Sequence, residues 1–376
     1  MKSAVEARIR DAAQELIDLS HRIHAHPELA FEEFQASAWV AETLHRAGFE
    51  VHHGCYELAT AVRATIGSGP IHVAICAEYD ALPDMGHACG HNMIAAAAVG
   101  AGLGLADFVD ELGLTVTVLG TPGEEGGGGK VLMLERGAFD GIDAAMMVHP
   151  ATTEMIAMPG TAVSQVRVSF TGKPAHAGAY PEEGINAADA MTIAQVAIGL
   201  LRQQTRQEDR IAGVVHEAGS AANIIPESAS GHWVLRSDTA EALASLKERV
   251  LRCFAAGATA TGCELTVSDV APDYADLRPD AKLLELYQAN AEAVGRIFPS
   301  VPSGFAGAAT DMGNVSHVVP TIHPMIGVDS AAAVNHQPEF AAACITATAD
   351  RALVESAIAM AWTAVDLSAF DTSWSQ

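Results

Sequence analysis

The chain has 376 residues, of which 49% are apolar and 18% are charged. This composition excludes a generally disordered chain, and the length predicts one or two domains. The 21 basic and 46 acidic residues give a net charge of −25. Such a charge argues against nucleic acid or an anionic membrane surface as the main partner, because phosphate groups are bound by Lys and Arg. No apolar run reaches the roughly 20 residues that span a bilayer.

The N-terminal segment is predicted to be an amphipathic helix rather than a signal peptide. Val5, Ile9, Ala12 and Leu16 recur at helical spacing, and no apolar segment with a cleavage site follows them. Six cysteines in a chain of this length are too sparse for a disulfide framework. A reducing cytoplasm is therefore the expected location.

Strand-like and helix-like patterns alternate between residues 71 and 150. Strands are predicted over 71–79, 114–120 and 143–150, and helices over 92–107 and 130–136. Strands that alternate with helices favour a largely parallel α/β layer with helices on both faces.

The pattern changes near residue 160. Strands are then predicted over 163–171, 211–217, 231–237 and 264–270, and helices over 184–206 and 240–256. The order β-α-β-β-α-β is the ferredoxin-like unit. The α/β pattern resumes after residue 272 and ends in a long helix over 339–366. We therefore expect a discontinuous α/β domain of residues 1–160 and 273–376, with an inserted α+β domain of residues 161–272.

Side chains that commonly bind metals occur at four places in the α/β part. These are Cys89 with His91 after the first strand, Glu124 with Glu125 after the second, His149 at the end of the third, and His336 before the last helix. In an open α/β sheet, ligands bind beyond the carboxyl ends of the strands, where three of these places lie. Thiolate, imidazole and carboxylate together suit Zn²⁺ and tolerate Mn²⁺, Co²⁺ or Ni²⁺.

Each of these signals is weak alone, since a histidine is commonly structural and a cysteine is commonly a small buried apolar residue. The pair Glu124 and Glu125, however, precedes four consecutive glycines at 126–129. Glycine runs carry an entropic cost, and they are expected where the backbone must pass close to another group or leave room for a substrate. Adjacent carboxylates can also divide two tasks, one binding a metal and the other accepting a proton.

A cysteine hydrolase is a competing interpretation of Cys89. His87 and His91 are only two residues away, which gives a poor geometry between a nucleophile and its base. A base from elsewhere in the chain could still serve.

Several segments together resemble the M20 metallopeptidase family, and within it the amidohydrolase branch and its aminoacylase-1-like type. These segments occur, in the family's order, at residues 22–29, 80–83, 86–92, 120–130, 172–177, 222–226, 310–316 and 335–340. They extend over nearly the whole chain, and their combination is far more specific than any one of them.

The resemblance implies a di-metal phosphorylase/hydrolase-like α/β catalytic domain with an inserted ferredoxin-like α+β lid, or dimerisation, domain. Two divalent ions, Zn or Mn with Co or Ni as alternatives, would be held by Cys89, His91, Glu125, His149 and His336. Glu124 would be the general base, and Asp80 would orient a ligand. Glu78 stands where the wider family has its first histidine ligand and is not expected to bind metal. Asn92 replaces an aspartate of the better-known branch members.

The inserted domain would contribute three further residues. His176 resembles the lid histidine that stabilises the oxyanion, often in the active site of the partner subunit. Asn223 and Arg236 match positions that hold a substrate carboxylate, which Arg can clamp with two parallel hydrogen bonds. A homodimer is the expected assembly.

The implied activity is metal-dependent hydrolysis of an amide bond next to an amino acid. An N-acyl amino acid, a dipeptide or an aryl amide such as p-aminobenzoyl-glutamate would be the substrate, and a metal-activated water would attack with Glu124 as base. The alternatives are a non-catalytic ligand-binding protein on the same fold and the cysteine hydrolase. Residues 305–307 are expected either to line the substrate pocket or to pack as an ordinary loop.

Overall fold

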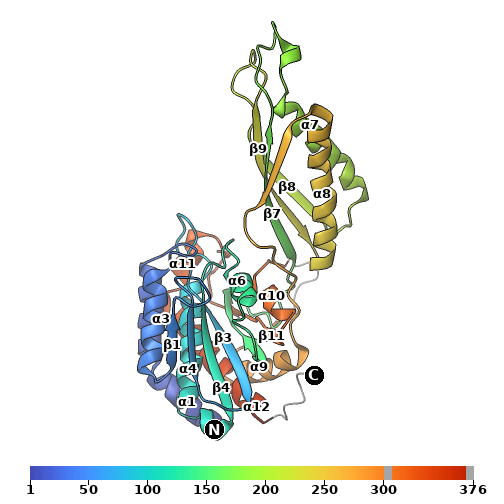
Figure 1. The fold of residues 1–376 in the computed structure, drawn as a ribbon. Coiled ribbons are helices and arrows are strands. Elements are labelled where there is room, and N and C mark those ends of the chain that lie inside the picture. Colours follow the sequence, from blue (N-terminus) through green and yellow to red (C-terminus); the bar gives the residue numbers. More distant parts are fainter. Residues whose placement is uncertain (300–306, 370–376) are drawn as a thin grey trace. The chain divides into compact units, whose positions relative to one another are not determined.

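The computed structural model describes residues 1–299 and 307–369, so Phe305 and Ala306 lie outside the described residues. The chain forms two compact units (Figure 1): unit 1 comprises Met1–Pro159 and Leu277–Gln376, and unit 2 comprises Gly160–Asp276. Within the described ranges, we find no helix that combines the length and the apolar character of a membrane span.

Unit 1 is built on a six-stranded sheet in the order β1-β2-β4-β3-β5-β11. Its strands are β1 Glu50–His53, β2 Val62–Ile66, β3 Ile71–Glu78, β4 Leu114–Thr121, β5 Ala144–Met146 and β11 Thr321–Ile322. The last four are parallel to one another, whereas β1 and β2 pair antiparallel to their neighbours. The sheet is therefore mixed, and it contains the expected parallel layer. A separate two-stranded sheet pairs β6 His149–Ala151 with β12 Met325–Gly327.

Helices cover both faces of this sheet. They are α1 Lys2–Asp11, α2 Ala13–Ala25, α3 Phe34–Arg46, α4 His91–Ala106, α5 Val109–Leu112, α6 Gly129–Glu135, α9 Ala281–Ala293, α10 Met312–Ser316, α11 Pro338–Ala343 and α12 Ala347–Leu367. Along β3, Val73 and Ile75 pack in the large core with α4 and α12, while Ala74 and Cys76 pack on the other side with residues of α6 and α10. This alternation is the two-residue period of a strand that is buried on both faces.

Two predicted elements of unit 1 are interrupted. The strand expected over 143–150 divides into β5 and β6, because β6 pairs with β12 instead of continuing in the large sheet. The helix expected over 339–366 divides into α11 and α12. The second helix begins at Ala347, and the preceding Thr346 caps it, because its hydroxyl accepts a hydrogen bond from the backbone N–H of Ala349.

Unit 2 is a four-stranded antiparallel sheet in the order β10-β7-β9-β8 with two long helices. Its elements are β7 Ala162–Thr171, η1 Pro181–Glu183, α7 Ala187–Leu201, η2 Arg202–Gln204, β8 Arg210–Glu217, β9 Ser228–Ser237, α8 Ala240–Thr261 and β10 Glu264–Asp269. The four strands and the two α-helices follow one another in the expected β-α-β-β-α-β order. The helix expected from residue 184 begins at Ala187, because the side chain of Asn186 caps it.

The core of unit 2 lies between one face of the sheet and the helices α7 and α8. Trp233 of β9 packs edge-to-face on Phe254 of α8, with ring centroids 4.8 Å apart. Inward and outward residues alternate along β7 and β9, as expected for an antiparallel sheet with one solvated face.

Candidate metal centre

The predicted metal ligands of unit 1 lie at the ends of strands and in the loops beside them. Cys89 precedes helix α4, and His91 is the first residue of that helix. Between them, Gly90 is the N-cap and has a φ of 77°. A Cβ atom at this glycine would lie 2.8 Å from the ring of Pro150, next to His149. The left-handed turn and the close approach to Pro150 both require glycine here.

Cys89, His91 and His149 form one buried group that could hold a cation. Sγ of Cys89 lies 3.5 Å from Nε2 of His149, and the rings of His91 and His149 meet edge-on with centroids 5.8 Å apart. All three side chains are buried.

Hydrogen bonds orient both histidines of this group. Nδ1 of His91 lies 2.9 Å from Oδ1 of Asp80, and Nδ1 of His149 lies 2.8 Å from the carbonyl oxygen of Pro150. Each Nδ1–H therefore donates to an oxygen, and each Nε2 is left as the ligand atom. Asp80 thus contacts a candidate ligand, His91. Its second oxygen accepts the backbone N–H of Glu125 at 2.8 Å.

A second group consists of Cys89, Glu125 and His336, and it shares the cysteine with the first. Nε2 of His336 lies 3.5 Å from Sγ of Cys89 and 3.4 Å from Oε1 of Glu125. His336 adopts a φ of 68°, and its N–H donates to the carbonyl of Ala88. Non-glycine residues in this conformation cluster at functional sites. The His336 side chain is 52% exposed, so this group opens to solvent.

The donor atoms of the two groups fit divalent cations. Nε2 of His91 and Oε1 of Glu125 are buried without a hydrogen-bond partner, which is unfavourable unless another group binds them. Burial lowers the pKa of His149 to about 4, which keeps its imidazole neutral as a ligand must be. Although burial lowers the pKa of His91, Asp80 and nearby groups raise it well above its ordinary value, so the site favours a positive charge.

Glu124 lies beside the ligands in the loop between β4 and α6, grouped with His91 and Glu125. Its side chain is buried, and burial together with the Glu125 carboxylate raises its pKa well above the ordinary value. A carboxyl group with a raised pKa can both accept and return a proton near neutral pH. Burial likewise raises the pKa of the Cys89 thiol well above its ordinary value, which opposes its use as a nucleophile.

Sequence reasoning missed a buried ion network beside this centre. Nζ of Lys130 lies 2.5 Å from Glu78 and 2.6 Å from Asp311, and all three side chains have no solvent exposure. Burial alone would raise the pKa of Glu78. The Lys130 ammonium and nearby histidines outweigh this effect and lower the pKa to about 2. Glu78 is in neither ligand group, although Oε2 lies 3.4 Å from Nε2 of His91. A lysine that follows a glycine run gave no sign of burial.

His323 was also missed. Its fully buried ring packs 5.3 Å from the ring of His149, and burial lowers its pKa to about 3. His323 is therefore an uncharged side chain at neutral pH that packs against His149.

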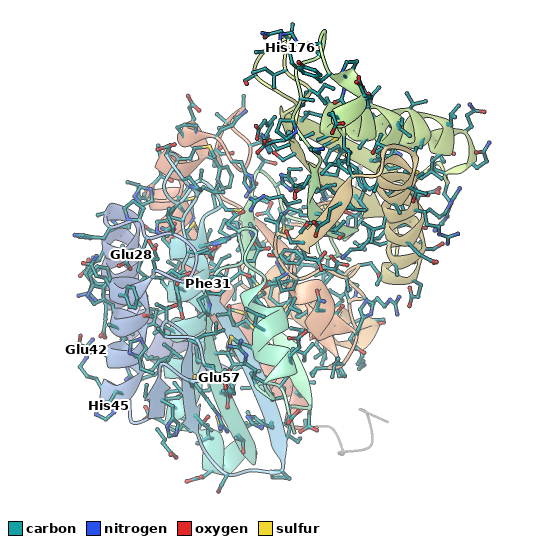
Figure 2. All side chains as sticks on the ribbon, turned by 45° about the horizontal axis from the view of Figure 1, so that its top comes forward. Glu28, Phe31, Glu42, His45, Glu57 and His176 are labelled. Atoms are coloured by element: carbon teal, nitrogen blue, oxygen red, sulfur yellow. The ribbon has the colours of Figure 1, made fainter. Side chains whose placement is uncertain are left out.

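In unit 2, the structure brings His176 and Asn223 together but not Arg236. The segments that carry His176 and Asn223 pair with each other, since Ala177 donates its N–H to the carbonyl of Asn223. Arg236 lies near the opposite end of β9, eight residues from Ser228, which is about 26 Å along the strand. All three candidates are exposed, and Figure 2 shows His176 at one end of unit 2. One small carboxylate cannot contact Asn223 and Arg236 of the same chain.

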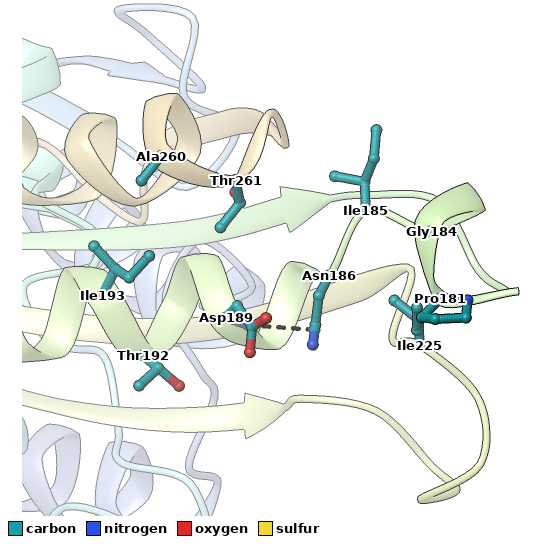
Figure 3. A pocket seen from close by; sticks show the side chains of 10 residues that line it. All are labelled: Pro181, Gly184, Ile185, Asn186, Asp189, Thr192, Ile193, Ile225, Ala260 and Thr261. Carbon is teal, nitrogen blue, oxygen red and sulfur yellow. Dashed lines mark hydrogen bonds between the residues drawn. The ribbon is translucent and has the colours of Figure 1, made fainter. Parts of the chain in front are cut away.

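Unit 2 also has a surface pocket between the start of α7 and the end of α8 (Figure 3). Its polar groups serve the fold: the Asn186 side chain accepts the N–H groups of Ala188 and Asp189. Its lining contains no cysteine or histidine, so it offers no comparable metal chemistry.

Comparison with known proteins identifies the family. The model of peptidase family M20/M25/M40 matches residues 74–354. The chain belongs to this family. It is 37% identical to the Xaa-Arg dipeptidase of Mus musculus over 388 residues, which cover 98% of this chain and 89% of the mouse protein. It is 30% identical to one of the subunits of the p-aminobenzoyl-glutamate hydrolase of Escherichia coli, over 66% of this chain and 56% of that protein.

Solved structures show the same fold over nearly the whole chain. A dinuclear metal-binding M20 peptidase from Bacillus subtilis aligns with a TM-score of 0.71 at 22% identity, covering 95% of this chain and 99% of its own. The aminobenzoyl-glutamate utilization protein of Klebsiella pneumoniae aligns with a TM-score of 0.77 at 20% identity, covering 95% and 98%. The family match and the named relatives show that the chain is a metal-dependent hydrolase of amide or peptide bonds, as the motifs predicted. Neither the binding protein nor the cysteine hydrolase is favoured.

Proposed function

We propose that the chain is a two-metal dipeptidase in which Glu124 is the general base. The observation that carries this proposal is the pair of ligand groups that share Cys89, with the buried carboxyl of Glu124 beside them. One ion would be held by Cys89, His91 and His149, and the other by Cys89, Glu125 and His336. When bound, such ions make a water acidic enough to lose its proton near neutral pH.

The side chains around this centre have separate tasks. Glu124 accepts the proton of the attacking water and returns it to the leaving amine, which its raised pKa favours. Asp80 keeps the Nε2 atom of His91 directed toward the cation. The cysteine favours zinc, whereas the histidines and carboxylate also accept manganese. The six free cysteines are consistent with a reducing cytoplasm.

For the substrate, we propose a dipeptide with a basic C-terminal residue. Support comes from the mouse relative named Xaa-Arg dipeptidase, which matches 98% of this chain. The E. coli relative named p-aminobenzoyl-glutamate hydrolase supports the second candidate, an aryl amide of glutamate, over a shorter match.

A substrate panel tests both proposals. The chelated protein is assayed with and without added Zn²⁺ or Mn²⁺ on alanyl-arginine, alanyl-lysine, alanyl-glutamate, acetyl-arginine and p-aminobenzoyl-glutamate. Metal-restored cleavage of alanyl-arginine and alanyl-lysine, with alanyl-glutamate cut at least tenfold more slowly, is the expected result. Preference for p-aminobenzoyl-glutamate would overturn the substrate proposal alone. Activity that survives chelation and is abolished by thiol alkylation would overturn the two-metal mechanism.

We further propose that unit 2 is a lid and dimerisation domain, and that His176 and Asn223 act together in the active site of the partner subunit. Support comes from their pairing on adjacent segments and from their separation from Arg236 along β9. In this arrangement Arg236 would clamp the substrate carboxylate of its own subunit, and His176 would stabilise the oxyanion of the other.

An exposed apolar surface of unit 2 supports the homodimer. Ile193, Val196 and Leu200 recur along α7 and are 36%, 58% and 59% exposed, and β8 is an edge strand with Val214 exposed beside its unpaired backbone. Edge strands and apolar stripes of this kind are typically covered by a partner. Val196→Glu should give monomers in light scattering, whereas Gln195→Glu on the same helix should remain dimeric.

Mixing two inactive variants distinguishes action across the dimer from action within one chain. Glu124→Ala and His176→Ala are each expected to be nearly inactive. After subunit exchange, mixed dimers would contain one intact site if His176 acts on the partner, and about half of the mixed dimers' sites should recover activity. No recovery, with exchange verified by mass, would show that His176 acts within its own chain.

A further inference from the structure

Glu33 is a fully buried carboxylate that the proposed mechanism does not use. It lies between α2 and α3, and its oxygens accept three hydrogen bonds. Oε1 accepts the backbone N–H groups of Phe31 at 2.9 Å and Gly123 at 2.8 Å, and Oε2 accepts the hydroxyl of Thr60 at 2.7 Å. Removing the acceptor would leave two buried donors and one part-buried donor unsatisfied. The position therefore needs an oxygen that an apolar side chain cannot supply.

The contact with Gly123 is important because this residue precedes Glu124. On the other side, the N–H of Glu125 donates to Asp80 at 2.8 Å. The backbone of Glu124 thus runs between two amides, and each amide is held by a carboxylate from a different part of the chain. Fixing both neighbours limits the backbone torsions at Glu124 and therefore the direction of its side chain.

Phe31 reinforces this arrangement by packing against the same loop. Its φ of 64° places it in the left-handed region, and Figure 2 labels it within unit 1. A Cβ atom at Gly123 would lie 2.9 Å from the Phe31 ring, and one at Gly127 would lie 2.6 Å from it. Two glycines of this loop are thus accounted for, because a side chain at either position would displace the ring.

Thr60 connects Glu33 to the loop that follows β3, which carries Asp80 and Cys89 and leads to His91. While its hydroxyl donates to Glu33, its carbonyl oxygen accepts the phenol of Tyr79, which stands between Glu78 and Asp80. The same N-terminal segment also contacts that loop directly, since the N–H of Ala81 donates to the carbonyl of Glu28. Glu33 is therefore joined to both loops that carry the centre.

We propose that Glu33 is a positioning residue for Glu124, and that residues 29–33 form a clamp that holds segment 123–127 in its working conformation. The inference rests on the proposed role of Glu124 as the base. It assigns a role to residues 29–33, which contribute neither a proposed metal ligand nor the proposed base.

The test compares three variants of the full-length, metal-loaded protein. Glu33→Leu removes the acceptor, and Glu33→Gln keeps an oxygen of the same reach. Glu28→Leu is the matched control, because the Glu28 carboxylate lies on the same segment but caps α3 through the N–H groups of Gln35 and Ala36. The measurements are hydrogen exchange of a peptide covering 122–129, metal content, melting temperature, and kcat and KM for alanyl-arginine.

Glu33→Leu should speed exchange in 122–129 at least tenfold and lower kcat by about 100-fold, since a misplacement of about 1 Å has that effect on a catalytic group. KM should stay within threefold, and two ions should remain bound. Glu33→Gln should restore most of kcat. Glu28→Leu should lower the melting temperature but leave kcat and the exchange of 122–129 unchanged.

The proposal is overturned if exchange of 122–129 is the same in Glu33→Leu and the wild type, or if Glu28→Leu lowers kcat equally. If Glu33→Leu does not fold, Phe31→Ala provides the same comparison, with faster exchange expected in 122–129 and unchanged exchange overturning the clamp. If the wild-type protein cleaves none of the substrate panel, the proposed function fails, while the exchange measurement still decides whether the clamp exists.

Discussion

The metal centre of unit 1 and the exposed loops of unit 2 hold their candidate residues in opposite surroundings. In unit 1, His91 and Glu125 present buried atoms that lack a hydrogen-bond partner, so the fold itself favours a bound cation. In unit 2, His176 is exposed and its Nδ1 already accepts the N–H groups of Gly178 and Ala179. The comparison teaches that a buried site shows its ligand requirement within one chain, whereas an exposed residue shows its task only against a substrate or a partner.

Removal of the proposed base, Glu124, tests the buried centre of unit 1 and should have the largest effect on activity. Glu124→Ala should lower kcat by roughly 10³-fold or more, since general-base catalysis contributes about 10²–10⁴, while both ions stay bound. Glu135→Ala, an exposed glutamate on α6, should be close to wild type. Stopped assays paired with metal analysis measure both properties. More than a few per cent of residual activity would show that another group is the base.

The two ligand groups should differ in how they lose metal. His336→Ala should retain one ion per chain, because the group of Cys89, His91 and His149 is buried and independent of it. Cys89→Ala should lose both ions, because both groups use its sulfur. Metal content after dialysis against a weak chelator measures this difference. Equal losses in the two variants would contradict the shared-sulfur arrangement.

The ion network tests whether buried charge in unit 1 is as strongly coupled as its distances imply. Lys130→Met leaves Glu78 and Asp311 buried and should lower the free energy of unfolding by about 3–5 kcal/mol. Lys173→Met in unit 2 breaks an exposed pair with Glu183 at 3.2 Å and should change it by about 0–1 kcal/mol. Denaturant unfolding of both variants measures this difference. Similar losses in the free energy of unfolding would contradict strong coupling in the buried network.

A smaller, pH-dependent effect is expected at Glu33. Burial raises its pKa from an ordinary value of 4.5 to about 7. Because the folded state keeps this proton to a higher pH than the unfolded chain does, the stabilisation is complete below pH 4.5 and is lost as pH rises through 7. The melting temperature of the wild type relative to Glu33→Gln should therefore fall by several degrees between these limits. A difference that does not vary with pH would contradict the raised pKa.

Much of the fold was predictable, because the strands over 71–79 and 114–120 and the helix over 92–107 carry strong local patterns that the structure reproduces within two residues. Family motifs were needed to gather Cys89, Glu125 and His336, since residues 36 to 247 positions apart show no local sign of contact. The network of Lys130 was not predictable for the same reason. Its partners come from the end of β3 and the approach to α10, and only the folded sheet brings them together. The break before α12 was visible in principle as the capping Thr346.

If Cys89 binds both ions as proposed, its sulfur also governs how the protein acquires them. A metal binds the thiolate, yet burial and the Glu125 carboxylate keep the free thiol protonated. Binding of a metal by this thiol would therefore release a proton, and the apparent metal affinity should fall about tenfold for each unit of pH decrease. If one sulfur serves both groups, the second ion would meet a thiolate that the first had already deprotonated. Under the proposed arrangement we therefore expect the two ions to bind cooperatively at neutral pH and to be released together in acid.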